Sequence, residues 1–168
     1  LYVEYLKAKP NVEITLYTNA NATSKDSIKT RLFNTVMNAK TGDNIIFYFS
    51  GHGDIDNVLN SGYLLLNQVS PARNFYGGSD ALEISQINSL LAIALNNKAK
   101  VHFIIDACKA GYADVAKNLD KSHSNDEHES VLMLSSKSSQ LSRELPELGG
   151  GHGVFTYYLV NGLKGLAD

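Results

Sequence analysis

The chain has 168 residues, of which 43% are hydrophobic, and its formal net charge is −2. This length suits one domain with a sizeable core. A charge so close to balance indicates neither a nucleic-acid partner nor an acidic membrane surface, and no apolar run approaches the roughly 18 residues that a membrane span needs. The single cysteine, Cys108, cannot form an internal disulfide. A reducing compartment suits such a chain, and we expect the cytoplasm.

The two ends of the chain carry no start or stop signals. Leu1 is not preceded by a methionine or a signal-like segment, and Asp168 follows no helix stop signal. We therefore expect a piece of a longer or processed protein, whose fold is completed by additional segments or by a partner chain.

The first elements alternate between helix and strand. Residues 1–9 predict the last turns of a helix that Pro10 ends. Residues 12–17 (VEITLY) alternate between apolar and polar side chains, as in a strand with one wetter face. A helix is then expected to start at Thr23, with Asp26 as its capping-box partner and an apolar stripe at helical spacing.

The middle of the chain predicts two strands and a helix. Residues 44–49 (NIIFYF) form an unbroken apolar run that is typical of a buried parallel strand, and this run leads into the sequence SGHG at 50–53. We expect a polar loop over residues 54–62, a short strand over 63–66, and a helix that Asp80 and Glu83 open.

The last part of the chain begins with a second buried strand. Residues 101–105 (VHFII) are followed by Asp106 and, two positions later, by Cys108. Residues 114–130 are polar and charged without periodicity, which predicts a mobile surface loop, and residues 131–134 predict a further buried strand before a final helix. Strands alternating with helices predict an α/β three-layer sandwich, with a mostly parallel sheet and helices on both faces.

The two central strands end in groups that can perform catalysis. If the strands lie close in one sheet, His52 and Cys108 project from the same edge, where open α/β sheets place their ligands. A thiol beside an imidazole is the minimum for nucleophilic catalysis, and the backbone amides of Gly53 and Cys108 are candidate donors to an oxyanion. The alternative is that Cys108 is a small buried hydrophobe and His52 a turn residue.

The other histidines and the acidic residues have simpler interpretations. His152 repeats the His-Gly dipeptide and is the second candidate for the base, whereas His102 is expected to pack within a strand, and His123 and His128 to be solvated. We considered calcium ligation by five carboxylates, but their spacing is irregular, so we expect a solvated acidic loop and no required metal or cofactor. These carboxylates belong to Asp54, Asp56, Asp114, Asp120 and Asp126.

Two motifs resemble a known family. The sequences SGHG at 50–53 and DACKAG at 106–111 are similar to those of the caspase-like cysteine peptidases, most closely the metacaspases and bacterial orthocaspases. A histidine about fifty residues before the cysteine is a known signature of caspases, and here the separation is 56. The segments VLMLSSKSSQLSRE and GGGHGVFTYYLVNGLKG resemble the start of the family's small-subunit half, so the resemblance covers nearly the whole chain.

The resemblance implies a caspase–haemoglobinase fold and a cysteine endopeptidase acting on proteins or peptides. His52 would be the general base, Cys108 the nucleophile, and the amides of Gly53 and Cys108 the oxyanion hole. Ser50 and Asp106 would line the pocket for the substrate residue before the cleaved bond. Animal caspases carry Gln at the position of Asp106 and cut after Asp, whereas metacaspases carry Asp there and cut after Arg or Lys.

The resemblance also divides the chain. Residues 1–168 would form one peptidase domain, with a large-subunit-like part at 1–113, a linker at 114–130 and the start of a small-subunit-like part at 131–168. Members are often cut between the two parts, and self-processing would fall after Lys117 or Lys121.

The chain also departs from the family pattern. Ala107 and Lys109 stand where metacaspases usually have Cys and His, and the family's first strand and its last strand and helix would lie before and after this sequence. Asp106 has an alternative role, in which its side chain caps the turn and never faces the substrate. The rival function is a non-catalytic caspase-like scaffold or regulatory module.

Overall fold

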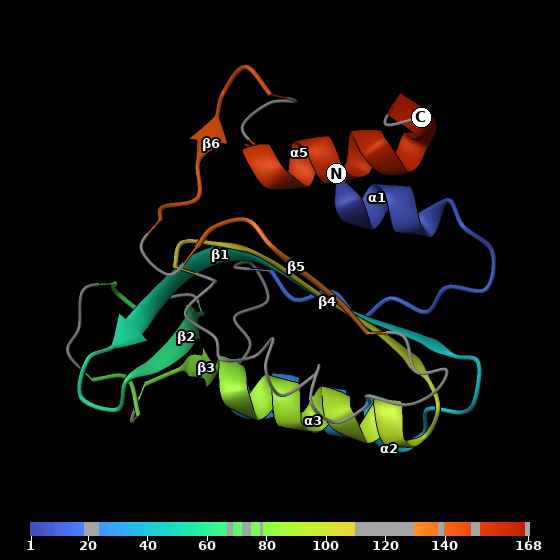
Figure 1. The fold of residues 1–168 in the computed structure, drawn as a ribbon, viewed down its shortest axis with the longest axis horizontal. Helices are drawn as coiled ribbons and strands as arrows, with labels where there is room; N and C mark the ends of the chain where they lie inside the picture. Colours follow the sequence, from blue (N-terminus) through green and yellow to red (C-terminus); the bar gives the residue numbers. More distant parts are fainter. Residues whose placement is uncertain are drawn as a thin grey trace.

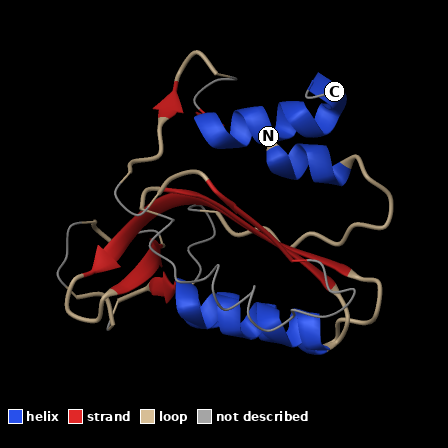
Figure 2. Cartoon of the chain, in the orientation of Figure 1, coloured by secondary structure: helices blue, strands red, loops and turns tan. Residues whose placement is uncertain are grey.

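The computed structural model describes residues 1–18, 24–66, 69–71, 75–77, 79–109, 130–137, 140–148 and 152–166. A central sheet separates two helical layers (Figure 1). The helices α2 (Lys25–Met37) and α3 (Ile84–Asn96) cover one face, and α1 (Tyr2–Lys7) and α5 (Val154–Asn161) cover the other. Colouring by secondary structure shows the same layers (Figure 2). The predicted three-layer α/β sandwich is confirmed.

Five strands of the described chain make up this sheet, namely β1 (Asn44–Asp56), β2 (Ser61–Leu65), β3 (Ala81–Glu83), β4 (Lys100–Ala107) and β5 (Ser130–Leu134). Their order is β3-β2-β1-β4-β5. The pairs β1–β4 and β4–β5 are parallel, whereas β2 runs antiparallel to both β1 and β3. All strands except β2 therefore share one direction, so the sheet is mixed and mostly parallel.

Strand β1 is longer than its apolar run. It pairs with β4 through residues 44–51 and then with β2 through residues 52–56, so it changes partner at His52. The predicted polar loop at 54–62 is therefore wrong at its start. Asp54 and Asp56 continue the strand because Tyr63 and Ser61 of β2 pair opposite them.

The main core lies between the sheet and the α2–α3 layer. Val36, Ile87 and Leu91 from the helices are fully buried against the sheet, and Phe47 meets Phe103 edge to face with ring centroids 5.4 Å apart. Burying each such side chain contributes roughly 1.5–3 kcal/mol, so this layer fixes the odd-numbered residues of β1 and β4 firmly. The sheet contributes Phe47, Phe49, Val101, Phe103, Ile105 and Ala107 to this core.

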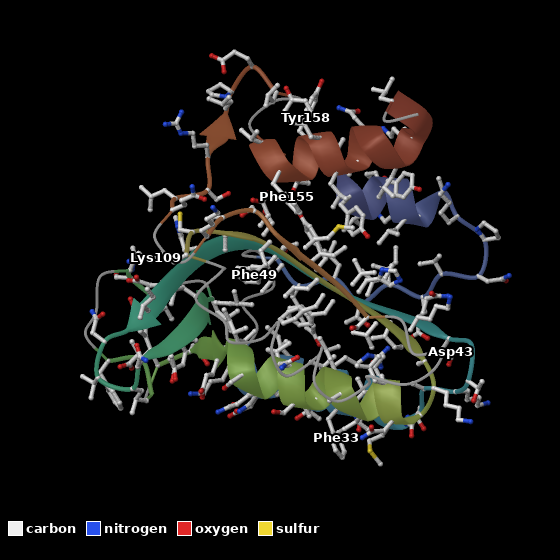
Figure 3. All side chains as sticks on the ribbon, viewed as in Figure 1. Phe33, Asp43, Phe49, Lys109, Phe155 and Tyr158 are labelled. Carbon is white, nitrogen blue, oxygen red and sulfur yellow. The ribbon has the colours of Figure 1, made fainter. Side chains whose placement is uncertain are left out.

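A second core lies on the opposite face. Tyr2 of α1, Ile104 of β4 and Val160 of α5 are its buried members, and Phe155 projects from α5 toward the sheet (Figure 3). A small two-stranded sheet of β6 (Glu144–Leu145) and β7 (His152–Gly153) precedes α5, and a π-helical turn, η2 (Gly162–Leu166), follows it. Even-numbered residues of β1 and β4 face this layer.

Two further expectations about elements were wrong, and one strand was missed where the helix was expected to open at Asp80. Residues 12–17 form no strand, and the side chains of Glu13 and Thr15 instead accept hydrogen bonds from Arg31 of α2. Helix α2 follows an N-cap at Ser24, whose hydroxyl accepts from the amide of Ser27, one position after the predicted start. The three-residue strand β3 was missed because so short a run carries no detectable alternation. The linker 114–130 lies outside the described residues up to Ser130, which begins β5.

Candidate active site

The candidate site lies where β1 and β4 end their pairing. Ser50 pairs with Asp106, and Gly51 pairs with Ala107. His52 follows Gly51 within β1, and Cys108 is the first residue after β4, so the register brings these two chain segments to the same edge of the sheet. The sheet edge predicted from the sequence therefore exists, and the residues directly before His52 and Cys108 are paired there.

Gly53 makes the closest approach between the two strands. A Cβ atom at this position would collide with the carbonyl oxygen of Cys108 and press on the Cβ of Ala107. Only glycine therefore fits here without moving the backbone of Cys108. This contact brings the predicted oxyanion-hole residues, Gly53 and Cys108, together.

The two residues of the expected dyad differ in their exposure to solvent. His52 is exposed and Cys108 is partly buried. Among the described residues, the Cys108 Sγ makes a long hydrogen bond to the carbonyl oxygen of Ser142, at 3.9 Å, rather than one to His52. Catalytic hydrogen bonds are often long or absent before substrate binds, so this arrangement is compatible with a dyad that closes on substrate.

Asp106 is buried, with an exposed fraction of 4%, and both its oxygens are hydrogen-bonded. Oδ1 accepts from the Ser142 hydroxyl at 2.8 Å, and Oδ2 accepts from the hydroxyl and the amide of Thr156 at 2.6 and 3.2 Å. Thr156 is in the first turn of α5, so Asp106 caps that helix from a neighbouring strand. Gly153 is required beside it, because a Cβ there would collide with Oδ2.

The Asp106 carboxylate belongs to a small polar network on the α5 side of the sheet. The hydroxyls of Tyr48 and Thr156 lie 2.6 Å apart. Burial raises the pKa of Tyr48, hydrogen bonding with Thr156 and Ser50 lowers it, and the charge of Asp106 raises it further, with a net increase. The predicted pocket pair, Ser50 and Asp106, therefore lies in one connected group.

Two serines were missed as parts of the site. Ser135 donates from its hydroxyl to the carbonyl of Ala107 and accepts from the Ala107 amide at 3.0 Å. Ser136 donates to the same carbonyl at 2.8 Å. Together they hold the peptide just before Cys108. The sequence signal was the serine-rich segment directly after the β5 strand, where a neighbouring strand end was to be expected.

Lys109 and Asp54 form an ion pair that sequence reasoning also missed. The Lys109 Nζ lies 2.5 Å from Asp54 Oδ1, and the Tyr76 hydroxyl donates to Asp54 Oδ2 at 2.7 Å. Asp56 accepts the amides of Val58 and Leu59 on one oxygen and the amide of Tyr76 on the other. Two of the carboxylates considered for calcium are thus engaged in holding the strand end.

The remaining predicted site residues are placed only in part. His152 lies in β7 opposite Leu145. Lys117 and Lys121 lie outside the described residues, as do three candidate calcium ligands. Within the described ranges, no group of three or more His, Cys, Asp and Glu could hold a metal ion, and no helix is long and apolar enough to cross a membrane. The three undescribed calcium candidates are Asp114, Asp120 and Asp126.

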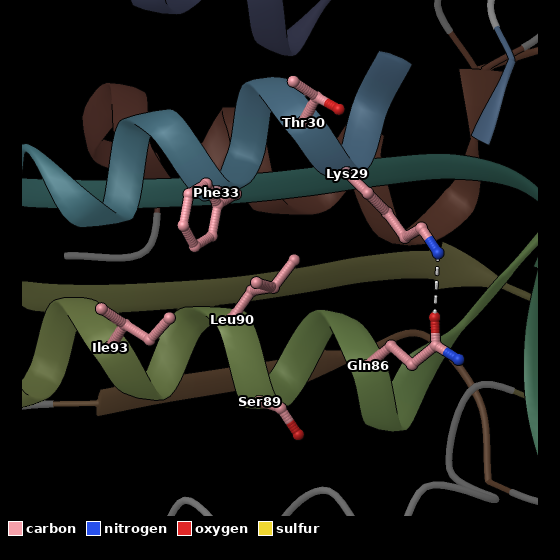
Figure 4. A pocket seen from close by; sticks show the side chains of 7 residues that line it. All are labelled: Lys29, Thr30, Phe33, Gln86, Ser89, Leu90 and Ile93. Carbon is pink, nitrogen blue, oxygen red and sulfur yellow. Dashed lines mark hydrogen bonds between the residues drawn. The ribbon is translucent and has the colours of Figure 1, made fainter. Parts of the chain in front are cut away.

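A groove between α2 and α3 is separate from this site. Phe33, Leu90 and Ile93 form its apolar floor, and the Lys29 Nζ donates to Gln86 at 3.2 Å across one end (Figure 4). None of the predicted site residues lines it. We therefore assign the chemistry to the sheet edge.

Comparison with known proteins identifies one family. The family model described as the caspase domain matches residues 6–167. Searches of curated proteins and of solved structures gave no significant match. The matched range includes both strand ends of the site and nearly the whole chain.

Proposed function

The chain belongs to the caspase-domain family of cysteine peptidases, and from this membership we propose that it is an endopeptidase with Cys108 as nucleophile and His52 as general base. The observation that carries the proposal is the β1–β4 register, which pairs Gly51 with Ala107, the residues directly before His52 and Cys108. The contact of Gly53 with Cys108 supports it further.

The proposed reaction proceeds through a thioester. His52 takes the thiol proton, and the thiolate forms a C–S bond to the carbonyl carbon of the scissile peptide. The amides of Gly53 and Cys108 donate to the oxyanion. The C–N bond then breaks as the leaving amine takes the proton from His52. Water, deprotonated by His52, hydrolyses the thioester to a carboxylate and restores the thiol.

The dyad is tested by single substitutions measured with fluorogenic peptides. We expect Cys108→Ala and His52→Ala to lose at least about a thousandfold in kcat/KM, because the nucleophile or its base is gone. His152→Ala, the matched histidine control, should keep most activity. Thermal melting checks that all three variants fold. Substantial cleavage by Cys108→Ala would contradict the proposed mechanism.

We propose that cleavage follows a basic residue, which places the chain with the metacaspases and orthocaspases within its family. The Asp106 carboxylate is buried and is bonded to the neutral donors Ser142 and Thr156. Among the described residues, no lysine or arginine pairs with it. A charge in that setting favours an arriving cation. At ~4 Å and an effective dielectric near 20, the attraction is about 4 kcal/mol before desolvation.

Specificity is tested with peptides ending in Arg, Lys or Asp. We expect Arg to be cut best, because Ser50 and Asp106 together can accept its planar fork, and Asp to be cut worst. In Asp106→Asn, the ratio of kcat/KM for Arg over Asp peptides should fall at least ~10-fold, since each 1.4 kcal/mol is a factor of ten. This ratio does not depend on how much enzyme is folded.

Asp43→Asn is the matched control for this test. Asp43 lies at the opposite end of the sheet from Lys109 (Figure 3), where its carboxylate accepts the amide of Lys40 at 2.8 Å. Its ratio should equal that of the wild type. If the Arg-over-Asp ratio of kcat/KM is unchanged in Asp106→Asn, Asp106 caps α5 and does not determine specificity.

The rival function is a non-catalytic scaffold or regulatory module. It is favoured by one observation, that the Cys108 thiol contacts the Ser142 carbonyl rather than His52. Mass spectrometry after treatment with a peptide-based alkylator separates the two. A peptidase labels Cys108 in a way that His52→Ala abolishes, whereas a scaffold labels at the same slow rate in both proteins.

We further propose a reducing compartment such as the cytoplasm, since the nucleophile must stay a free thiol. The dyad chemistry needs no metal or cofactor, so cleavage should persist in a chelator. Repeating the peptide assay with added calcium checks for activation. The substrate partner is a protein or peptide.

A further inference from the structure

Lys109 connects the two strand ends of the site through its side chain. It is the residue directly after Cys108, and Asp54 is two residues after His52. The Lys109 Nζ and Asp54 Oδ1 lie 2.5 Å apart, with 37% of the lysine side chain and 7% of the aspartate side chain exposed. An ion pair with one partner so well buried is less screened than a pair at the surface.

Asp54 is held in place behind this contact. Its other oxygen accepts a hydrogen bond from the hydroxyl of Tyr76, which is fully buried. The Tyr76 amide in turn donates to Asp56 at 2.7 Å. The Asp54 carboxylate that pairs with Lys109 therefore has a fixed position on β1, and it does not move when the lysine side chain moves.

The backbone of Lys109 is in an unfavourable conformation. Its φ of 55° lies in the left-handed region, which a residue with a Cβ adopts only when its surroundings enforce it. The Lys109 amide donates to the carbonyl of Gln140 at 2.9 Å, and the side chain is anchored at Asp54. The same turn directs the Cys108 carbonyl against Gly53.

We propose that Lys109, through Asp54, is a positioning residue that holds the Cys108 turn in register with the strand of His52. This inference rests on the proposed function, since it concerns how the dyad is assembled. Lys109 does not touch the reacting atoms. It fixes the peptide that follows the nucleophile, and Tyr76 keeps its anchor rigid.

The experiment compares Lys109→Met with Lys109→Arg and Asp54→Asn. We expect Lys109→Met and Asp54→Asn each to lower kcat by about 10- to 100-fold with little change in KM, because a small misplacement of a nucleophile is costly. Lys109→Arg should recover most of the loss. The double variant should be little worse than either single variant, because both remove the same contact.

Lys98→Met is the matched control. Lys98 also has a left-handed backbone, with a φ of 62°, but it is exposed and lies at the end of α3, before β4 begins. Removing its charge should leave kcat unchanged. Thermal melting of every variant separates a loss of folded protein from a loss of rate per folded molecule.

A second measurement does not require peptide cleavage. Because Cys108 is the only cysteine, iodoacetamide labelling measured by mass spectrometry reports on this thiol alone. The pH profile of labelling in Lys109→Met should move toward that of His52→Ala, while Lys109→Arg and Lys98→Met keep the wild-type profile. A wild-type protein that cleaves nothing overturns the proposed function, and the labelling profile then still decides the positioning role. A wild-type kcat and profile in Lys109→Met overturns the inference.

Discussion

Gly53 is the residue at which the strand that carries His52 touches the turn at Cys108, backbone to backbone. The atoms that a Cβ would meet are the carbonyl of Cys108 and the Cβ of Ala107. Neither is the tip of a flexible side chain, so the new methyl group has to displace the β4 end. The site therefore tolerates no enlargement here.

We predict that Gly53→Ala lowers kcat by about 100-fold, because a displacement near 1 Å has that effect on an oriented nucleophile. Gly51→Ala is the matched control on the same strand. Its Cβ would meet only the ring of Phe49, at 3.1 Å, which is a side chain that can adjust, so a change of a few-fold is expected. Peptide kinetics on both variants test this, and equal losses would contradict it.

At this scale the sequence predicted His52 and Cys108 but not their supports. Both follow apolar runs of adjacent parallel strands, so their place at one sheet edge follows from strand topology. The bond between Lys109 and Asp54 joins residues 55 positions apart, and it depends on β1 continuing past its apolar run. The hydroxyls of Ser135 and Ser136 likewise reach Ala107 only because β5 lies beside β4. No local pattern encodes such contacts.

The turn that joins β1 to β2 is organised by one carboxylate. Asp56 is fully buried and accepts three backbone amides, from Val58, Leu59 and Tyr76. Burial alone would raise the pKa of Asp56, but these hydrogen bonds outweigh it and hold the pKa below its ordinary value. The turn is therefore stabilised by the ionised form.

The lowered pKa predicts an acid-sensitive turn. The stabilisation by Asp56 is fully present above the unfolded-state pKa of ~3.9 and is lost as pH falls through the lower folded-state pKa. Asp56→Asn should melt several degrees lower near pH 7, because its amide group would present a donor to the amide of Tyr76. The difference from the wild type should shrink as the pH is lowered through that range. A difference in melting temperature between Asp56→Asn and the wild type that stays constant at all pH values would contradict this assignment.

Elements were predictable where packing agrees with the pattern. Ile28, Leu32 and Val36 of α2 face the same core as alternate residues of β1 and β4, so helical spacing located the helix and apolar runs located the strands. Residues 12–17 alternate equally well but form no strand, because a strand also needs a partner edge. Strand β1 extends beyond its predicted end because β2 provides a pairing partner for its polar residues.

The whole molecule is held together across the region where self-processing was predicted. Strand β4 precedes the linker and β5 follows it, and the two pair in parallel from Val101–Ser130 to Ile105–Leu134. The contact continues beyond the strands, where Ser136 donates to the Ala107 carbonyl. The two parts of the chain are therefore neighbours in one sheet.

We predict that cleavage after Lys117 or Lys121 leaves a stable two-fragment protein. Sequencing of new N-termini after incubation locates the cut, and the fragments should co-elute in native size-exclusion chromatography because the β4–β5 pairing is intact. Separation of the fragments under native conditions would show that the β4–β5 pairing does not hold them together. If purified Cys108→Ala is cut at the same rate as the wild type, the cut comes from a contaminating protease.

The change of partner along β1 has a consequence for motion. His52 stands between a stretch hydrogen-bonded to β4 and a stretch hydrogen-bonded to β2, within one unbroken strand. Both neighbours are well buried, at Phe103 and Ile105 on one side and at Leu64 and Leu65 on the other. Amide protons on both flanks should therefore exchange with solvent only through large-scale opening. The backbone of His52 would keep its place for minutes to hours, while its imidazole ring, exposed at the edge, reorients in nanoseconds.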